Sequence, residues 1–185
     1  MQKDIDIIIY GATGFTGQLC VKYFQSLNTD VNWAIAGRDQ DKLQKVASDN
    51  SVDVEMLIAD SDDEVALDIL TSRAKVILST TGPFHRYGSK LVASCVKNSA
   101  NYVDITGENF WVKGLIAKHH EEASAKGIRI IPSCGYDSIP SDLGVFYSAK
   151  VLNKPIKRIE SFHSWEGGAS GGTLETMFSM GDLDL

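Results

Sequence analysis

The sequence has 185 residues, of which 43% are hydrophobic and 23% are charged, and these are the proportions of a folded globular protein rather than a disordered chain. The formal net charge of -6 excludes the broad basic field with which proteins bind a nucleic-acid backbone. The length suffices for one well-formed core and part of a second, so two complete domains are not expected.

The three cysteines, Cys20, Cys95 and Cys134, lie far apart in the sequence and form no CxxC pair. Their odd number and spacing favour reduced thiols over a disulfide framework or a zinc site, so we expect a reducing, cytoplasmic compartment. No charged leader with an apolar core precedes Ile5, which predicts no signal peptide. No run approaches about 18 apolar residues, the length that spans a bilayer. Contact with a membrane or lipid surface is left open.

Short β-branched runs alternate along the chain with longer helical stretches. The runs predict six strands, at residues 4–10, 31–37, 52–59, 74–80, 101–105 and 128–132. Helices are predicted at residues 14–27, 41–47, 63–72, 89–98, 109–126 and 141–151. This alternation is typical of a parallel sheet with helices on both faces, and right-handed crossovers favour the doubly wound Rossmann α/β order 3-2-1-4-5-6.

The regular alternation ends near Pro155. The stretch IKRIESFHSWEGGASGG, residues 156–172, predicts one long strand with a glycine-rich exit. We therefore expect residues 1–152 to form the Rossmann domain and residues 153–185 to begin a second domain. That second domain would be incomplete, because about 30 residues do not close a core of their own.

The first predicted strand runs directly into a glycine-rich turn, YGATGFTG. Gly11, Gly14 and Gly17 allow a tight strand-to-helix turn, close approach of the backbone to a pyrophosphate, and a helix N-terminus aimed at it. A plain turn between a strand and a helix can carry the same three glycines. The position after the first strand of an alternating chain favours a dinucleotide loop, in which Thr13 and Thr16 add hydroxyl donors.

The second predicted strand ends in AGRDQDKL, at the place where an NAD site carries an acidic residue against the ribose hydroxyls. Here Gly37 leaves room for a phosphate, and Arg38 offers a positive charge to the 2′-phosphate of NADP. The alternative interpretation of Arg38 is a solvated surface arginine. Asp39 is interpreted as the N-cap of the next helix. Asp60, after the third strand, either approaches the adenine end of a cofactor or only favours the N-terminus of the following helix.

The fourth predicted strand ends in STTGPFHRYG, beside the first strand, at the crevice where open α/β sheets bind their ligands. Thr80, Thr81 and Gly82 are therefore candidates for the pyrophosphate and nicotinamide-ribose part of a cofactor site, and Pro83 stiffens the turn. His85 follows them and is a candidate for a substrate pocket, although a single loop histidine is more often structural.

The sixth predicted strand runs into PSCGYDSIPSDLG, where Tyr136, Asp137 and Ser138 are the other candidates for a substrate pocket. Ser141 is interpreted as the N-cap of the helix that follows. His119, in KHHEE, lacks the i, i+4 histidine partner of a helical zinc site, so we interpret it as a packing residue and expect no metal.

The segments YGATGFTG, AGRDQDKL, TTGPFHRYG and CGYDSIPSDLG, together with YVDITGE and GGASGGT, make nearly the whole chain resemble the saccharopine dehydrogenase-like oxidoreductases, in the branch of the trans-acting enoyl reductases. The resemblance implies an N-terminal NADP-binding Rossmann domain followed by a second α/β domain for substrate or dimerisation, of which residues 153–185 would be the start, and it assigns no acid or base. It implies cofactor contacts at Gly11, Thr13, Gly14, Phe15, Thr16, Gly17 and Arg38, with Thr81, Gly82 and Pro83 near the nicotinamide.

The expected function is an NADPH-dependent oxidoreductase that transfers hydride to a C=C, C=O or C=N bond of a lipid-like or small-metabolite substrate. The alternative is a non-catalytic NADP-binding sensor or interaction module, because the same glycine loop serves both. The second domain is expected to be incomplete, so this chain on its own is either active or inactive. A homodimer formed through the missing part is a further open alternative.

Overall fold

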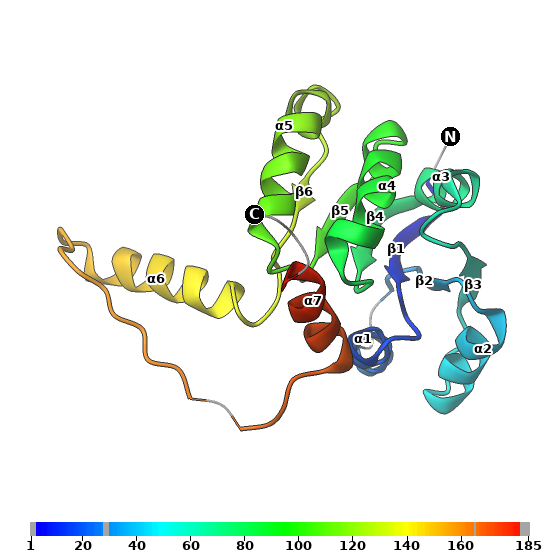
Figure 1. The fold of residues 1–185 in the computed structure, drawn as a ribbon, viewed down its shortest axis with the longest axis horizontal. Coiled ribbons are helices and arrows are strands. Elements are labelled where there is room, and N and C mark those ends of the chain that lie inside the picture. Colours follow the sequence, from blue (N-terminus) through cyan, green and yellow to red (C-terminus); the bar gives the residue numbers. More distant parts are fainter. Residues whose placement is uncertain (1–2, 28–29, 165, 182–185) are drawn as a thin grey trace.

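The computed structural model describes residues 3–27, 30–164 and 166–181. Its centre is a parallel six-stranded sheet in the order β3-β2-β1-β4-β5-β6, so the doubly wound Rossmann order is confirmed (Figure 1). The strands are β1 Ile5–Tyr10, β2 Trp33–Gly37, β3 Glu55–Ile58, β4 Ala74–Ser79, β5 Asn101–Asp104 and β6 Ile130–Ile131.

Helices α1 to α6 follow the strands in the order that the sequence predicts, whereas α7 was not predicted. They are α1 Phe15–Ser26, α2 Gln40–Asp49, α3 Glu64–Arg73, α4 Phe84–Lys97, α5 Asn109–Ala125, α6 Ile139–Leu152 and α7 Gly171–Gly181. Helices α1 and α2 pack on one face of the sheet around Ile9 and Ile35. Helices α3, α4 and α5 pack on the other around Ile8 and Ile77. Each fully buried Ile or Leu contributes about 1.5–3 kcal/mol, so both faces hold the sheet firmly.

Three expectations from the sequence are corrected. Helix α4 begins at Phe84 rather than at residue 89, because its first turn is capped by a distant side chain described below. The N-cap of α6 is Ser138 and not Ser141, since Pro140 fits the first turn of that helix. The long strand predicted over residues 156–172 is absent among its described residues: they have no regular structure until α7 begins at Gly171, and no sheet edge lies alongside to pair with them.

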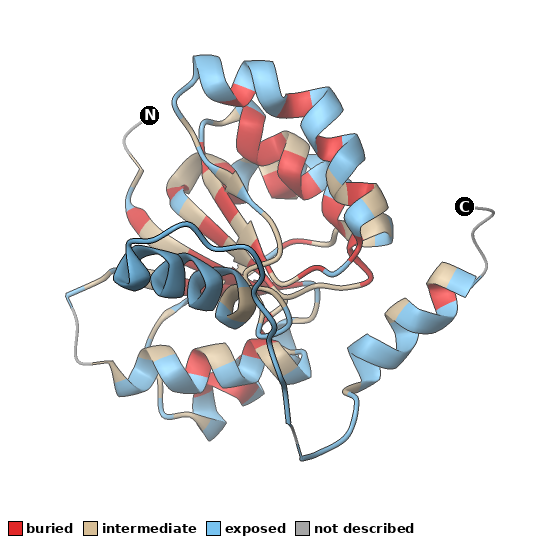
Figure 2. Cartoon of the chain, turned by 90° about the vertical axis from the view of Figure 1, so that its left-hand side faces the viewer, coloured by how far each residue is buried: buried red, intermediate tan, exposed pale blue. Residues whose placement is uncertain are grey.

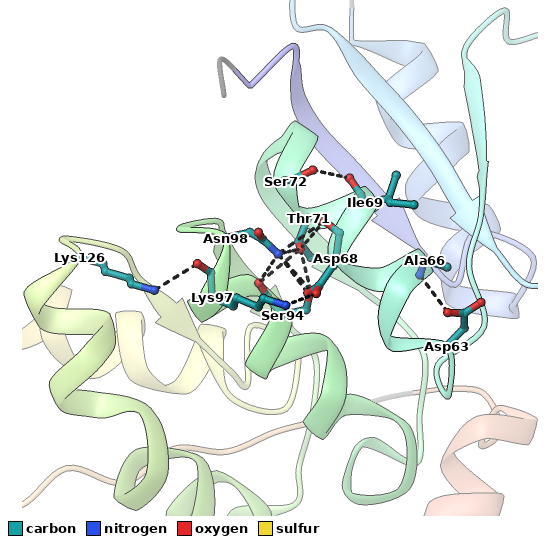
Figure 3. A network of polar contacts seen from close by, with 10 residues as sticks. All are labelled: Asp63, Ala66, Asp68, Ile69, Thr71, Ser72, Ser94, Lys97, Asn98 and Lys126. Carbon is teal, nitrogen blue, oxygen red and sulfur yellow. Dashed lines mark hydrogen bonds and ion pairs between the residues drawn. The ribbon is translucent and has the colours of Figure 1, made fainter.

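A polar network holds α3 against α4 (Figure 3). The Asp68 carboxylate accepts hydrogen bonds from Ser94 Oγ at 2.6 Å and Asn98 Nδ2 at 3.1 Å, and it pairs with Lys97. The Lys97 ammonium, followed by the Ser94 hydroxyl, lowers the pKa of Asp68. Thr71 Oγ1, fully buried, lies 2.8 Å from Ser94 Oγ and accepts from Asn98 Nδ2 at 2.9 Å. This network fixes the spacing of the two helices that precede and follow β4.

The last two helices differ from the others in their packing. No residue of α6 is buried, and in α7 only Ser179 is. Figure 2 shows both helices almost wholly in the exposed colour. Large apolar side chains such as Phe146 and Phe178 are therefore left on the surface, at 63% and 74% exposure. No helix in the described part of the chain is long and apolar enough to cross a membrane.

Candidate functional site

The turn between β1 and α1 needs glycine at two of its three glycine positions. Gly11 has a φ of +84°, and a Cβ added there would lie 2.3 Å from Thr81 Oγ1. A Cβ on Gly17 would lie 2.2 Å from the carbonyl oxygen of Gly11. The glycines thus let the β4 loop approach the turn and let α1 pack against it.

The N-terminus of α1 is free of any group that would compete with an anion. Gly14 is its N-cap, so no side chain caps the helix, and its first turn carries no acidic residue. The amide of Gly14 donates to the carbonyl of Gly11 at 3.0 Å, which closes the turn. An uncapped helix N-terminus behind a glycine turn is a ready place for a phosphate, because its N–H groups and its dipole both favour negative charge.

A cavity of about 340 Å³ opens where β1, β2 and β4 end. Its walls come from the glycine turn, the loops after β2, β3 and β4, and the first turns of α4 and α7. The lining residues are Tyr10, Gly11, Thr13, Gly14, Phe15, Thr16, Gly37, Arg38, Ser61, Thr80, Thr81, Gly82, Tyr87, Ser170, Gly172 and Glu175. The cavity lies at the topological switch point of the sheet, where this fold binds ligands.

Most of the residues that the sequence assigned to the cofactor meet at this cavity. Two of them stand behind its wall: Gly17 is buried under the turn, and Pro83 is buried as the N-cap of α4, after a cis peptide bond. The residues that line the cavity are Gly11, Thr13, Gly14, Phe15, Thr16, Arg38, Thr81 and Gly82. The structure therefore brings together segments that are up to about 70 residues apart.

Arg38 projects from the end of β2 at one side of the cavity. It is exposed and has no hydrogen-bond or ion-pair partner within the described ranges, so its charge is free for a ligand. Asp39 does not compete, because it caps α2 by accepting from Lys42 N at 3.0 Å. Asp60 stands outside the lining and accepts from the amide of Asp62 at 2.9 Å, while Ser61 takes the place in the wall.

The buried groups beside Arg38 are uncharged. The hydroxyl of Tyr10 donates to the Ala59 carbonyl at 3.3 Å. Burial, and then the charge of Asp60, raises the pKa of Tyr10, so the phenol stays protonated. The cavity therefore offers a neutral wall with one cation at this end.

Two threonines after β4 face the glycine turn. Thr80 Oγ1 donates to the carbonyls of Tyr10 and Gly11, at 3.2 and 3.1 Å, which ties the two loops together. Thr81 Oγ1 is buried and has no partner among the residues that the structure describes. An unpartnered buried hydroxyl in a cavity wall is costly unless a ligand satisfies it, which fits a polar molecule bound there.

His85, a sequence candidate for the substrate pocket, is instead part of a buried pair behind the cavity wall. Its Nδ1 lies 2.6 Å from Glu108 Oε2, and the same carboxylate accepts from the amides of Phe84 and His85 at 2.8 and 2.7 Å. Glu108 is fully buried. It caps the first turn of α4 from 24 residues away in sequence, which explains the early start of that helix. The sequence marked Glu108 only through its place in YVDITGE.

Asp104 is a second buried carboxylate that was not a candidate. It accepts from the hydroxyl of Tyr102 at 2.8 Å and from the amides of Thr106 and Ser133, each at 3.0 Å. Desolvation raises its pKa. Asp104 therefore binds the loop after β5 to the loop after β6.

The other substrate-pocket candidates are separate from the cavity. Tyr136 is 66% exposed. Asp137 is exposed, with Oδ1 near Gly135 and Oδ2 near Gly107. Ser138 is the N-cap of α6 and makes no side-chain cap hydrogen bond. None of them contributes to the described lining, so their role in binding a substrate stays a prediction.

Several lining residues were missed by sequence reasoning. Ser61 follows β3, and Ser170, Gly172 and Glu175 come from the start of α7. The glycines and serine of GGASGGT were a signal for a turn near a ligand, but nothing local in that segment says which loop it meets.

His119 lies away from the cavity and packs in α5 near Leu115 and Ala123, all three being buried, which confirms the interpretation of a packing histidine. Burial lowers its pKa. Within the described ranges, no group of three or more His, Cys, Asp or Glu side chains is placed to hold a metal ion.

Comparisons with known proteins agree with this geometry. Residues 7–131 match a family model described as the saccharopine dehydrogenase NADP binding domain. A trans-acting enoyl reductase of Mycobacterium leprae is 39% identical over 148 residues, which cover 78% of this chain and 35% of the relative. A lipid droplet localized protein of Caenorhabditis elegans is 35% identical over 189 residues, covering 93% of this chain and 44% of the relative.

Among solved structures, apo saccharopine dehydrogenase (L-Glu forming) of Saccharomyces cerevisiae superimposes with a TM-score of 0.65 at 18% identity. The superposition covers 80% of this chain and 31% of the yeast chain. At this identity the likeness shows the fold alone. The chain spans 35% of the length of the Mycobacterium leprae relative and 44% of the length of the Caenorhabditis elegans relative.

Proposed function

Because the chain belongs to the saccharopine dehydrogenase family, whose NADP-binding domain spans residues 7–131 here, we propose that it binds NADP(H) in the cavity at the ends of β1, β2 and β4. The bound cofactor is then used in the NADPH-dependent reduction of a substrate. The observation that carries this proposal is that Arg38, the glycine turn and the loop after β4 line one cavity. When bound, NADPH supplies a hydride, and the protein supplies binding and orientation.

Different residues of the chain would bind different parts of the cofactor. The uncapped N-terminus of α1, behind Gly11 and Gly14, would hold the pyrophosphate. Arg38 would hold the 2′-phosphate through charge-assisted hydrogen bonds. Thr81 Oγ1, buried and unpartnered within the described structure, would meet a polar group near the nicotinamide ribose. Gly17 and Pro83 support the wall without touching the ligand.

For the acceptor, we propose a C=C, C=O or C=N bond of a lipid-like or small-metabolite molecule. The names of the relatives, an enoyl reductase and a lipid droplet localized protein, support a lipid-like substrate. We further propose a cytoplasmic protein that contacts lipid surfaces. The three unpaired cysteines support a reducing compartment, and the exposed apolar side chains of α6 support lipid contact.

The domain boundary expected near residue 152 is also part of this proposal. Helix α6 ends at Leu152, and among the described residues beyond it only Ser179 is buried. Residues 1–152 would then form the cofactor domain, and residues 153–185 would begin the part that binds substrate or a second subunit.

The proposal is tested by measuring the affinity of the chain for NADPH and NADH, with wild type and Arg38→Ala. A charge-assisted hydrogen bond contributes roughly 1.5–3 kcal/mol, so Arg38→Ala should reduce the preference for NADPH by about ten- to a hundredfold. The matched control is Arg86→Ala, since Arg86 is exposed and outside the cavity lining. An unchanged NADPH:NADH ratio in Arg38→Ala would reject the role of Arg38.

A turnover assay with enoyl and carbonyl acceptors separates the enzyme from a non-catalytic NADP-binding sensor. The assay follows NADPH oxidation by absorbance, both for this chain and for a version extended to the length of its relatives. Tight NADPH binding with no turnover by the extended protein would favour the sensor.

A further inference from the structure

The first two turns of α7 form a wall of the cavity although they lie more than 80 residues from the loops they face. Ser170, Gly172 and Glu175 line the cavity. Thr176 Oγ1 lies 3.8 Å from the point that a Cβ on Gly82 would occupy. The start of α7 is therefore placed at the exit of β4, on the side of the cavity assigned above to the nicotinamide ribose.

Two charged side chains from different parts of the chain line the cavity. Among its described lining residues, Arg38 and Glu175 are the only charged ones. Glu175 is exposed and takes part in no hydrogen bond or ion pair within the described ranges, so its carboxylate is available to a ligand.

A free carboxylate in a cavity for NADP(H) distinguishes the two redox forms of the cofactor only beside the nicotinamide, because a hydrogen bond from a ribose hydroxyl would stabilise both forms alike. Beside the pyrophosphate or the 2′-phosphate it would repel the cofactor, since like charges at short range are unfavourable. Beside the nicotinamide it would attract the oxidised ring, which is a cation, and it would neither attract nor repel the reduced ring, which is neutral. Thr176, the residue after Glu175, lies near Gly82, which agrees with the second placement.

Gly172 adds a steric argument. An added Cβ would have only Ser170 Oγ within 4 Å, at 3.9 Å, so a larger side chain at this position is tolerated by the fold. Because Gly172 lines the cavity, we expect a larger side chain there to take up part of the cavity. The small residue at position 172 therefore leaves space in the cavity that the chain itself does not fill.

From this arrangement we infer that the first turns of α7 are the nicotinamide-side wall of the cofactor site, and that Glu175 makes the site prefer oxidised NADP⁺ over NADPH. The inference rests on the proposed NADP(H) site and assigns it a wall outside residues 7–131, the part that matches the family's NADP-binding domain. Residues 170–176 thereby couple the redox state of the cofactor to the segment that follows the Rossmann domain.

The test measures dissociation constants of the full chain for NADPH, by its fluorescence, and for NADP⁺, by competition. Glu175→Gln should raise the dissociation constant for NADP⁺ about two- to fivefold relative to that for NADPH, the range expected of an exposed ion pair. Glu166→Gln is the matched control, because Glu166 is exposed in the same segment and outside the lining.

A second variant tests the wall without changing charge. Gly172→Leu should weaken binding of both cofactor forms. Gly168→Leu should leave both unchanged, since a Cβ added at Gly168 would lie within 4 Å of no described atom apart from its chain neighbours and Gly168 does not line the cavity. Amide hydrogen exchange in α7 should slow when NADPH binds, while exchange in α6 stays as it was.

The outcomes separate this inference from the proposed function. If wild type binds NADPH but both variants bind like wild type and α7 exchange is unchanged, α7 is not a wall of the site. If Glu175→Gln tightens NADP⁺ and NADPH equally, Glu175 lies by the phosphates and the nicotinamide placement is wrong. If wild type binds neither form, the proposed function fails, and this inference fails with it.

Discussion

Residues 3–131 and residues 139–181 are both rich in apolar side chains, yet the two regions use them differently. In the first region, six strands and five helices bury side chains such as Ile8, Ile77 and Leu91 completely. In the second, α6 and α7 expose Phe146 and Phe178, and among the described residues only Ser179 is buried (Figure 2). Apolar content alone therefore does not tell which part of a chain has a core.

The difference shows how the cavity is built. The Rossmann region supplies a rigid floor, because its loops are joined by the half-buried Thr80 and by the buried Asp104 and Glu108. The start of α7 supplies the facing wall from a segment with little packing of its own. Weakly packed elements open at low free-energy cost, so we expect the wall to move more readily than the floor.

The largest expected effect compares a leucine from each region. Leu91→Ala, in α4, should lower the free energy of unfolding by about 2–5 kcal/mol, because it leaves a cavity in a filled core. Leu91 is 0% exposed and Leu143, in α6, is 53% exposed. Leu143→Ala should change stability by less than about 0.5 kcal/mol. Urea unfolding followed by circular dichroism measures both, and similar losses would show that α6 is packed in solution.

The next effect compares a helical glycine from each region. Gly17→Ala should destabilise the chain by about 1–3 kcal/mol and weaken NADPH binding, because the added methyl overlaps the Gly11 carbonyl. Gly144→Ala, in α6, has nothing within 4 Å of the added methyl and should stabilise by about 0.5–1 kcal/mol through helix propensity. Thermal unfolding and NADPH titration check the pair. A stable Gly17→Ala that binds normally would mean that the turn can relax.

The smallest effect concerns pH. Burial lowers the pKa of His119 below its ordinary value of 6.5, with Lys118 acting in the same direction and Glu122 against it. The folded state then binds fewer protons than the unfolded state, so stability is complete above about pH 6.5 and declines as the pH falls below it. His119→Gln should reduce the pH dependence of the unfolding free energy between pH 7 and pH 5.

His163 is the control for this pH effect, because it is exposed in the segment before α7. His163→Gln should retain the wild-type pH dependence in the same urea titrations. An equal flattening in both variants would assign the effect to net charge rather than to the burial of His119.

Most of the Rossmann region was predictable from the sequence, and the reasons are local. Alternating β-branched runs and helical stretches set the order of elements, and the glycine turn and Arg38 lie where the fold brings strand ends together. Errors occurred at element boundaries, such as the start of α4, because the cap of that helix comes from Glu108. The long strand predicted before α7 was wrong because a strand needs a neighbouring edge, which the sequence of that segment does not reveal.

The chain sequence by itself determined the fold and the cofactor class and pointed to eight of the residues that line the cavity, because hydrophobic period and glycine geometry act over a few residues. One of the eight, Phe15, came only from the family resemblance. Only the tertiary structure decided that Glu108 holds the start of α4, that His85 pairs with the buried Glu108, and that Glu175 lines the same cavity as Arg38. These are contacts between residues far apart in the chain, and only the packing of complete elements brings such residues together.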